Sequence, residues 1–262
     1  MTKTITGKNL FRLIDEWVSD GQRYYFRGEP EDGYLLLPSL LRNDTYSRLS
    51  EKYQEPMPIA LEARLIQRFR RYTSHIYHSN SDFHGRQFSD LEMLCLAQHN
   101  GLPTLLVDWT LNPFVALYFA LRSHYYQDPI QKRDASFWVM RLAPKSERDH
   151  LTVHLEDPSD TWADRVESTR ALYPLLVVPL VFTHRIAAQG GRFVYAAFLQ
   201  DGRKGIDEIG LKDKPWSMLE RYRVPAEERQ ALLQRLTIIG MHEGTLFTDL
   251  EGWAKYLRDG NL

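Results

Sequence analysis

Residues 98–113, which read QHNGLPTLLVDWTLNP, hold more chemistry-bearing side chains than any other segment of the chain. An apolar run of strand character ends there in Asp108, Trp109 and Thr110, and a helix is predicted to begin directly afterwards. A carboxylate, an indole and a hydroxyl therefore stand beside the free N–H groups of a helix start, an arrangement that can hold a small anionic or polar ligand. The same groups could instead serve the fold alone, since Asp108 can cap the helix, Trp109 can be core and His99 can donate to a backbone carbonyl.

Two other positions could bring polar groups to a ligand. The sequence predicts Arg27 at the end of a short strand beside Gly28, where a guanidinium fork can reach phosphate or carboxylate oxygens. A surface ion pair with Glu29 is the alternative. Gln189 stands before the glycine pair 190–191, which either lets the backbone approach a ligand closely or forms a turn between strands.

A third candidate is the basic side of an amphipathic helix predicted over residues 61–76. Arginines at helical spacing form that side: Arg64, Arg68 and Arg71. Charged faces of this kind are usually only solvated. Because Phe69 and Tyr72 are interleaved with the arginines, phosphate contacts and stacking on bases would also suit single-stranded RNA or DNA.

The composition limits the classes of function. Among 262 residues, 33 Lys and Arg balance 34 Asp and Glu, so the formal charge of −1 offers no global attraction to nucleic acid or to an anionic membrane. Cys95, the single cysteine, excludes an internal disulfide, and its place on the apolar side of a predicted helix argues against a reactive thiol. With no signal-peptide pattern and no apolar run of about 18 residues, we expect a cytoplasmic protein without a membrane span.

Common catalytic motifs are absent from the sequence. It contains no Walker loop, no Gly-x-Gly-x-x-Gly and no Gly-x-Ser-x-Gly elbow, which argues against a kinase, a Rossmann dehydrogenase and a serine hydrolase. His75, His78 and His84 are spaced too loosely to predict a metal site, and the segment around His150 and His154 favours a strand. We therefore assign no metal.

Helix and strand signals predict one α+β domain. Apolar periodicity, the capping boxes at 89–92 and 248–251, and a proline at a first turn predict helices at residues 10–18, 61–76, 89–101, 112–120 and 225–236 and after 248. Predicted strands cover residues 24–26, 104–108, 136–142, 175–181 and 193–198. No linker or repeat divides the chain, so we expect a single domain over residues 1–262, with a helical part at 8–100, a sheet-centred part at 101–262, and a mixed, mostly antiparallel sheet flanked by helices.

Four ordered motifs resemble the FRG domain family of bacteria and phages. They are Phe26-Arg27-Gly28 and the segments 98–120, 185–193 and 244–252, which together span nearly the whole chain. Thr248 stands where the family pattern has proline. The order of an arginine on an early strand, a strand ending in a hydroxyl residue and a helix reading Ala-x-x-Phe-Ala is more remotely similar to ADP-ribosyltransferases.

The resemblance implies an ADP-ribosyltransferase-like α+β fold with NAD as co-substrate. It implies a catalytic set, Arg27, Asp108, Thr110 and Gln189, in which Arg27 holds a phosphate or ribose of NAD and Thr110 orders the pocket. It also implies a set of cofactor-binding residues: Tyr25, Arg27, Gly28, Glu29, His99, Trp109 and Tyr118. The aromatic residues of this set would stack on nicotinamide.

Gln189 occupies the place in chain order where these enzymes have a glutamate near the ribose. An amide can orient a ribose hydroxyl but cannot act as a base, so Asp108 or Glu243 would do that work, or the pocket binds NAD-like ligands without turnover. The resemblance further implies a macromolecular acceptor, nucleic acid or protein, an antitoxin or regulatory partner, and a role as a toxin or anti-phage effector. A non-catalytic nucleotide-binding module and a metal-independent nuclease, with His99 and Asp108 as base and orienter, are the alternatives.

Overall fold

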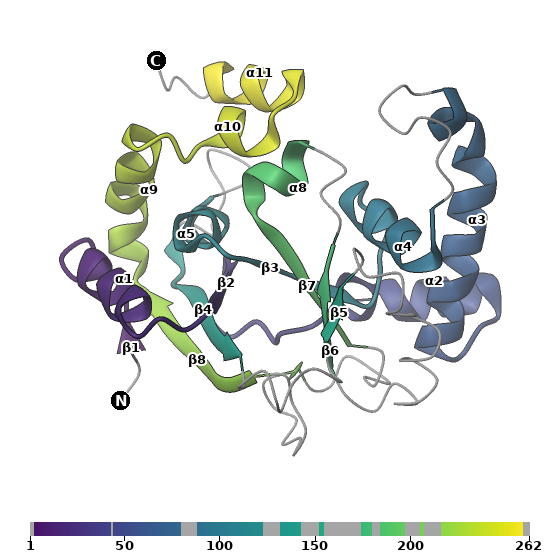
Figure 1. The fold of residues 1–262 in the computed structure, drawn as a ribbon, viewed down its shortest axis with the longest axis horizontal. Helices are drawn as coiled ribbons and strands as arrows, with labels where there is room; N and C mark the ends of the chain where they lie inside the picture. Colours follow the sequence, from purple (N-terminus) through teal and green to yellow (C-terminus); the bar gives the residue numbers. More distant parts are fainter. Residues whose placement is uncertain are drawn as a thin grey trace.

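The computed structural model describes residues 3–42, 44–79, 88–122, 132–142, 152–154, 174–179, 184–196, 205–206 and 216–258. Eight strands in this part of the chain form one sheet, in the order β1-β8-β4-β2-β3-β7-β6-β5 (Figure 1). Their bounds are β1 Lys3–Thr4, β2 Tyr24–Glu29, β3 Leu106–Thr110, β4 Ala135–Leu142, β5 Thr152–His154, β6 Leu175–Val178, β7 Gly191–Tyr195 and β8 Trp216–Val224. Neighbouring strands pair antiparallel, except β1 with β8 and β5 with β6, which are parallel. The predicted α+β class and mixed, mostly antiparallel sheet are confirmed.

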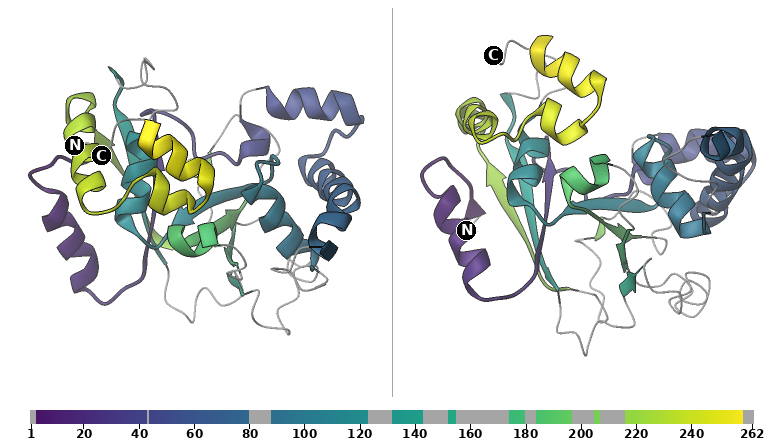
Figure 2. Two further views of the ribbon diagram at one scale, coloured as in Figure 1. Left: turned by 90° about the horizontal axis from the view of Figure 1, so that it is seen from above. Right: turned by 45° about the horizontal axis from the view of Figure 1, so that its top comes forward.

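Helices lie around this sheet. Their bounds are α1 Leu10–Ser19, α2 Thr45–Tyr53, α3 Pro58–Ser79, α4 Asp90–His99, α5 Pro113–Leu121, α8 His184–Gln189, α9 Arg229–Ile238, α10 Glu243–Phe247 and α11 Leu250–Arg258, with 3-10 turns η1 Ser39–Leu41 and η6 Ala226–Glu228. In Figure 1, α1 and α9 lie beside β8 on the left, and α2, α3 and α4 gather on the right. Figure 2 shows from two further sides that the C-terminal helices α10 and α11 stand apart from the α2–α4 group.

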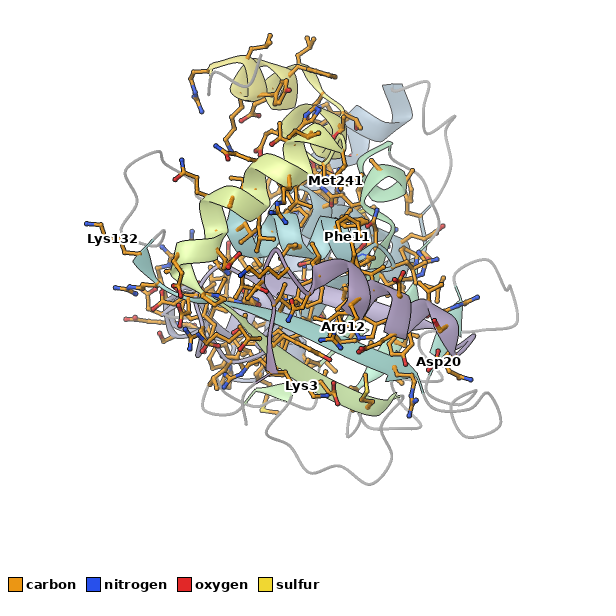
Figure 3. All side chains as sticks on the ribbon, turned by 90° about the vertical axis from the view of Figure 1, so that its left-hand side faces the viewer. Lys3, Phe11, Arg12, Asp20, Lys132 and Met241 are labelled. Atoms are coloured by element: carbon orange, nitrogen blue, oxygen red, sulfur yellow. The ribbon has the colours of Figure 1, made fainter. Side chains whose placement is uncertain are left out.

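The side chains on the two faces of the sheet pack into two separate hydrophobic cores. Tyr25 and Phe26 are neighbours on β2, yet Tyr25 packs with α3 and α4, whereas Phe26 packs with α1, α5 and α9, because successive strand residues point to opposite faces. On the second face the Trp17 ring stacks on Phe137 with 5.8 Å between ring centroids and meets Tyr222 edge-on. Figure 3 faces this side, with α1 in front of β4 and β8.

The sheet opens between its two central strands. All six residues of β2 pair with β4, and all five residues of β3 pair with β7, but β2 and β3 share one registered pair, Phe26 with Thr110. Beyond that pair the strands diverge. The first half of the sheet, β1-β8-β4-β2, therefore meets the second half, β3-β7-β6-β5, across a gap that side chains must fill.

Gly28 continues β2 instead of ending it, and the strand runs through Glu29. A Cβ atom at Gly28 would lie 1.9 Å from the backbone oxygen of Ala116 and 2.5 Å from the backbone nitrogen of Ala120. Helix α5 thus packs on β2 at a distance that only glycine permits. The prediction that the strand stops at Phe26 was wrong because the glycine serves this contact and not a turn.

Local signals place most of the helix boundaries that matter for the site. The Ser89 hydroxyl accepts from the Glu92 N–H, and the Glu92 carboxylate accepts from the Ser89 N–H at 2.8 Å, which confirms the first capping box. Asn112 caps α5 by accepting the Phe114 N–H at 2.9 Å, and Pro113 is the first residue of that helix.

Several boundaries differ from those predicted. Strand β3 begins and ends two residues later than the predicted 104–108, so Thr110 is its last residue. The second capping box is wrong: Thr248 has a left-handed backbone with φ of 52°, and the Asp249 carboxylate accepts the Gly252 N–H at 2.7 Å. One interpretation of residues 185–193 was a glycine-rich turn between strands; instead, α8 covers residues 184–189, and Gly190, with φ of 57°, connects it to β7. Strand β2 lies at the centre of the sheet, although it belongs to the chain segment 8–100 that was expected to be mainly helical.

Some predictions fall on residues outside the described part of the chain, among them His84, His150 and the ends of the predicted strands 175–181 and 193–198.

Among the described residues, none of the helices combines the length and apolar character that crossing a membrane requires. Cys95 is fully buried, and burial raises the pKa of its thiol, which keeps the sulfur protonated and unreactive.

Glu62 of α3 is a buried carboxylate behind β3. It accepts the Leu105 N–H and, at 2.7 Å, the Tyr195 hydroxyl. Burial raises the pKa of Glu62 from 4.5 to about 7, although both hydrogen bonds oppose the rise. The folded chain therefore keeps a proton that the unfolded chain has released, so this contribution to stability is complete below pH 4.5 and is lost as the pH rises through about 7.

We expect the free energy of unfolding to fall by up to about 3 kcal/mol between about pH 5 and pH 8, and Glu62→Gln to remove most of this decline. The amide can accept from Leu105 and contact Tyr195 without carrying charge. Urea unfolding of both proteins across this pH range measures the effect. An equal dependence on pH in the two proteins would contradict the assignment to Glu62.

Candidate functional site

Arg27 lies inside β2, and its guanidinium crosses the opening between the two halves of the sheet. Its Nε and Nη2 donate to Glu29 Oε1 at 2.8 and 2.6 Å, and its Nη1 donates to the backbone oxygen of Asp108 at 2.6 Å. Arg27 is 9% exposed and Glu29 is 2% exposed. Burial alone would lower the pKa of Arg27, but the charges of Glu29 and Asp108 outweigh it and raise this pKa.

Arg42 brings a second cation to the same carboxylate. Its Nη2 donates to Glu29 Oε1 at 3.0 Å, and its Nε donates to the backbone oxygen of Leu37 at 2.9 Å. Burial, and then the charge of Arg27, lower the pKa of Arg42, whose side chain is 36% exposed. Glu29 Oε1 thus accepts three N–H groups, while Oε2 has no hydrogen-bond partner among the described residues. Asp108 is a second carboxylate near these two cations, so the four side chains together are formally neutral.

Asp108 presents its carboxylate to solvent beside this cluster. The side chain is 61% exposed, and one oxygen lies 3.7 Å from Arg27 Nη1. The Gln98 amide of α4 donates to both Asp108 oxygens, at 3.2 and 3.1 Å, and the Thr104 hydroxyl donates to the other end of the Gln98 amide. This chain of hydrogen bonds orients the carboxylate without burying it, so Asp108 can accept further donors.

Thr110 fixes the other side of the opening. Its hydroxyl donates to the backbone oxygen of Gln189 and accepts the Asn112 N–H at 3.0 Å, which ties the end of β3 to α8 and to the start of α5. The Gln189 amide donates to the backbone oxygen of Leu246 at 3.1 Å. Both side chains therefore hold elements together, and Gln189 directs its amide nitrogen toward α10.

One cavity of about 370 Å³ gathers most of the predicted site. The predicted residues that line it are Arg27, Gly28, Glu29, His99, Asp108, Trp109, Thr110 and Gln189. Four arginines and two carboxylates are among its lining residues, so its formal charge is positive. The Trp109 ring is 3% exposed, and its indole N–H is buried without a hydrogen-bond partner among the described residues. A buried donor without a partner costs about 1–3 kcal/mol.

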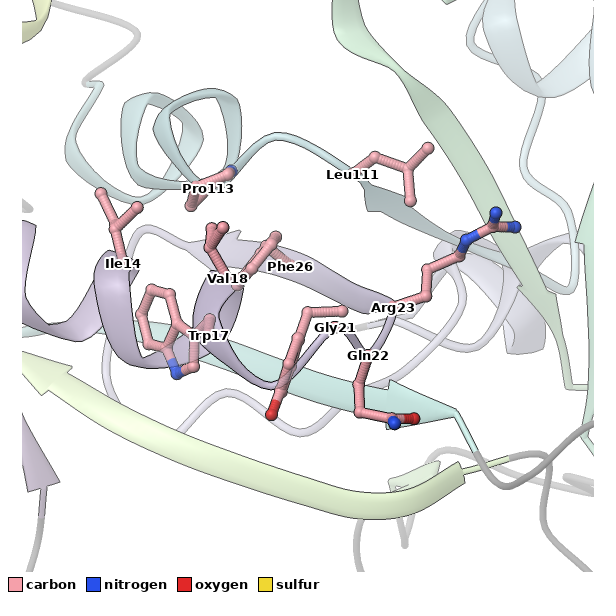
Figure 4. A pocket seen from close by; sticks show the side chains of 10 residues that line it. Ile14, Trp17, Val18, Gly21, Gln22, Arg23, Phe26, Leu111 and Pro113 are labelled. Carbon is pink, nitrogen blue, oxygen red and sulfur yellow. The ribbon is translucent and has the colours of Figure 1, made fainter.

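A second cavity of about 380 Å³ lies between α1, the start of β2 and the start of α5 (Figure 4). Its walls are largely apolar, with Trp17, Val18 and Leu111 prominent, and Arg23 is the one charged residue among those that line it. Its volume matches that of the first cavity, but it lacks groups that could do chemistry. The cavity at the opening of the sheet is therefore the candidate site.

Two predicted aromatic residues do not reach this cavity. Tyr25 is 1% exposed within the core that α3 and α4 cover. Tyr118 is 5% exposed in the opposite core, and its hydroxyl donates to Glu243, which Lys255 also contacts at 2.7 Å. Glu243 is held there and does not line the cavity, so it is not placed to act on a ligand in it. The structure leaves Trp109 as the predicted aromatic residue at the site.

The site also contains residues that the sequence did not single out. Arg42, Arg122, Arg192, Gln98, Tyr34, Phe119 and Phe193 line the cavity. Arg122 lies over the Phe119 and Phe247 rings, at 5.2 and 4.9 Å from their centroids. Gln98, Phe119, Arg192 and Phe193 lie within the motifs 98–120 and 185–193 but were assigned no role, and no local motif marks Tyr34, Arg42 or Arg122. The predicted partner-binding residues Arg64, Arg68 and Arg71 lie on α3 and do not line it.

Fold and site together define a class of protein: an α+β chain whose sheet opens at its centre into a polar cavity lined by arginines. Residues 22–128 match the model of the FRG domain. The match runs from just before β2 to just after α5 and includes Arg27 and Asp108, whereas the motifs at 185–193 and 244–252 lie beyond it. The extension of the domain over residues 1–262 stays a prediction. No curated protein and no solved structure matches the chain.

Proposed function

We propose that this FRG-domain protein binds NAD in the cavity at the opening of the sheet and transfers its ADP-ribose to a macromolecule. The observation that carries the proposal is the combination of four arginines with two carboxylates in the lining of one cavity. A dinucleotide offers anionic phosphates for the arginines and hydroxyls for the carboxylates. The cavity volume falls within the range of about 300–1,000 Å³ that is usual for small-molecule sites.

We assign different roles in NAD binding to Arg27, Arg42 and Thr110. Arg27 is held by Glu29 and by the backbone of Asp108, so its part is to shape the cavity and supply charge. Arg42, one third exposed, has guanidinium N–H groups left over after its two hydrogen bonds and is the donor we assign to the phosphates. Thr110 keeps the wall in place, as the resemblance to ADP-ribosyltransferases implies.

The two carboxylates supply the chemistry. In the transfer, the bond between ribose C1′ and the nicotinamide nitrogen breaks, its electron pair leaves with nicotinamide, and a lone pair of the acceptor forms the new bond to C1′. The transition state resembles an oxocarbenium ion, which nearby negative charge stabilises. We assign Glu29 Oε2 to a ribose hydroxyl and the exposed Asp108 carboxylate to the proton that the acceptor loses.

Purified chain incubated with NAD and cell extract should release nicotinamide and label an acceptor with ADP-ribose. Asp108→Asn should lower turnover by about 100-fold or more while NAD still binds, because the amide keeps the shape but cannot take a proton. Arg42→Gln should weaken NAD binding measured by calorimetry, and Arg23→Gln, at the apolar second cavity, is the matched control and should change neither.

A non-catalytic nucleotide-binding module is the second candidate, favoured by the engagement of Gln189 with Leu246 and by the absence of a carboxylate at that position. NAD binding without nicotinamide release would support it against the transferase. Absence of NAD binding would overturn both, and RNA or DNA degradation in EDTA without NAD would favour a nuclease that uses His99 and Asp108. A role as toxin or anti-phage effector, with an antitoxin or regulatory partner, belongs to the transferase proposal and depends on it.

A further inference from the structure

Helix α3 carries arginines along its solvent side. Arg64, Arg68 and Arg71 are exposed and recur at the i, i+4 and i+7 positions, so they share one face. The three residues span about 10 Å along the helix axis, at roughly 1.5 Å per residue. They thus form a row of exposed forked donors, whereas Leu65 and Ile66 of the same helix are buried in the core.

Within the described part of the chain, none of these three arginines forms an ion pair with a carboxylate. The single acid in α3 is Glu62, which is buried and bonded to Leu105 and Tyr195. Arg70 is the arginine of this helix that forms an ion pair with a described carboxylate, that of Asp90. In a chain whose formal charge is −1, so local an excess of positive charge attracts a polyanion to this one face.

Tyrosine rings are interleaved with the arginines. Arg68 lies over the rings of Tyr53 and Tyr72, at 5.4 and 5.8 Å from their centroids. Arg64 lies 5.9 Å from the Tyr53 centroid and donates to the Tyr53 backbone oxygen at 2.8 Å, which joins the end of α2 to α3. Lys52 also lies over Tyr53, and the Tyr72 side chain is 64% exposed. The surface formed by Lys52, Tyr53, Arg64, Arg68, Arg71 and Tyr72 is termed the α2–α3 face.

We infer that the α2–α3 face binds single-stranded nucleic acid. Guanidinium forks pair with successive phosphates, and a ring as exposed as Tyr72 gives a base a flat surface on which to stack. A duplex keeps its bases stacked on one another and cannot use the rings, while an acidic peptide or an anionic membrane would use the charges but not the alternation of charge and ring. This inference does not depend on NAD binding, because the α2–α3 face and the cavity share no residue.

Fluorescence anisotropy with a labelled single-stranded oligonucleotide of about 12 nucleotides tests the inference. We expect the strand to bind more tightly than a duplex of the same sequence. The triple variant Arg64→Ala/Arg68→Ala/Arg71→Ala should raise the dissociation constant at least tenfold at low salt and reduce the slope of log K against log salt by about 2, since each lost phosphate contact removes roughly 0.7. Tyr72→Ala should raise the dissociation constant about fivefold or more, through lost stacking alone and with the salt slope unchanged.

The matched control is Lys8→Ala/Arg12→Ala/Arg23→Ala, which removes the same charge from exposed positions in and around α1. It should bind the oligonucleotide as the parent does. Equal losses in the two triple variants, an unchanged affinity in Tyr72→Ala, or equal binding to the duplex or to vesicles of anionic phospholipid would overturn the inference. Calorimetry with NAD on the α3 triple variant separates this result from the proposed activity, because NAD binding should be unchanged.

Discussion

Replacing Gly28 with alanine should cost the chain more than about 3 kcal/mol of stability or prevent folding, the largest effect we expect from adding a single methyl group. The new Cβ would meet the backbone of α5, at 1.9 Å from the Ala116 oxygen and 2.5 Å from the Ala120 nitrogen. Backbone atoms cannot rotate away as a side chain does. Relief would require α5 to move off β2, although Ala116 and Ala120 are fully buried in the core between them.

Gly7→Ala is the matched control for this substitution. There the added Cβ would approach Arg235 Nη1 at 2.6 Å, which is the end of a flexible side chain that can shift. We expect a loss below about 1 kcal/mol. Urea unfolding followed by circular dichroism compares the midpoints, and similar midpoints for the two variants would show that α5 does not need the glycine.

Glu29→Gln should lower the free energy of unfolding by about 3–5 kcal/mol, the second large effect. The carboxylate is almost fully buried and holds both Arg27 and Arg42 on one oxygen. An amide of the same shape leaves the buried Arg27 with only the more distant Asp108 carboxylate and Arg42 without the carboxylate that it contacts. Glu31→Gln, which breaks the exposed ion pair with Arg133, is the control and should cost about 1 kcal/mol or less.

A double-mutant cycle attributes the loss to charge. In an Arg27→Met background, Glu29→Gln should cost at least about 1 kcal/mol less than in the parent, because one of the two stranded cations is gone. The measurement is again the urea midpoint. Equal costs in both backgrounds would mean that Glu29 stabilises the fold by packing and not through its charge.

Helix ends that are marked by a cap or a glycine were predictable from the sequence. Strands that are defined by pairing with a strand far away in the chain were not. The Ser89 capping box, the Asn112 cap and the left-handed Gly21 and Gly101 mark helix ends within a few residues of chain. Strand β8 reads as a mixture of polar and apolar residues, and β1 is two residues long, so pairing with a strand far away in sequence defines both.

The candidate site was predictable in its motif residues. Arg27, Asp108 and Trp109 come from two segments whose order in the chain resembles a known family, and they line one cavity. Arg42 was not predictable, because it reaches Glu29 only through the path of the chain after η1. Tyr25 was misplaced because its side depends on which face of β2 each core covers, and an isolated strand of three aromatic residues does not reveal that.

The order of the strands has a consequence for the smallest part of the chain that can form the sheet. The family model covers β2 and β3, but each strand finds its fully paired neighbour, β4 or β7, in sequence that follows residue 128. In a fragment limited to the matched residues, β2 and β3 would each have an unpaired edge, and the two strands would be connected by one registered residue pair, Phe26 with Thr110. The unit that can pair all its strands is thus larger than the matched segment, because β4 and β7 supply the hydrogen bonds that β2 and β3 need.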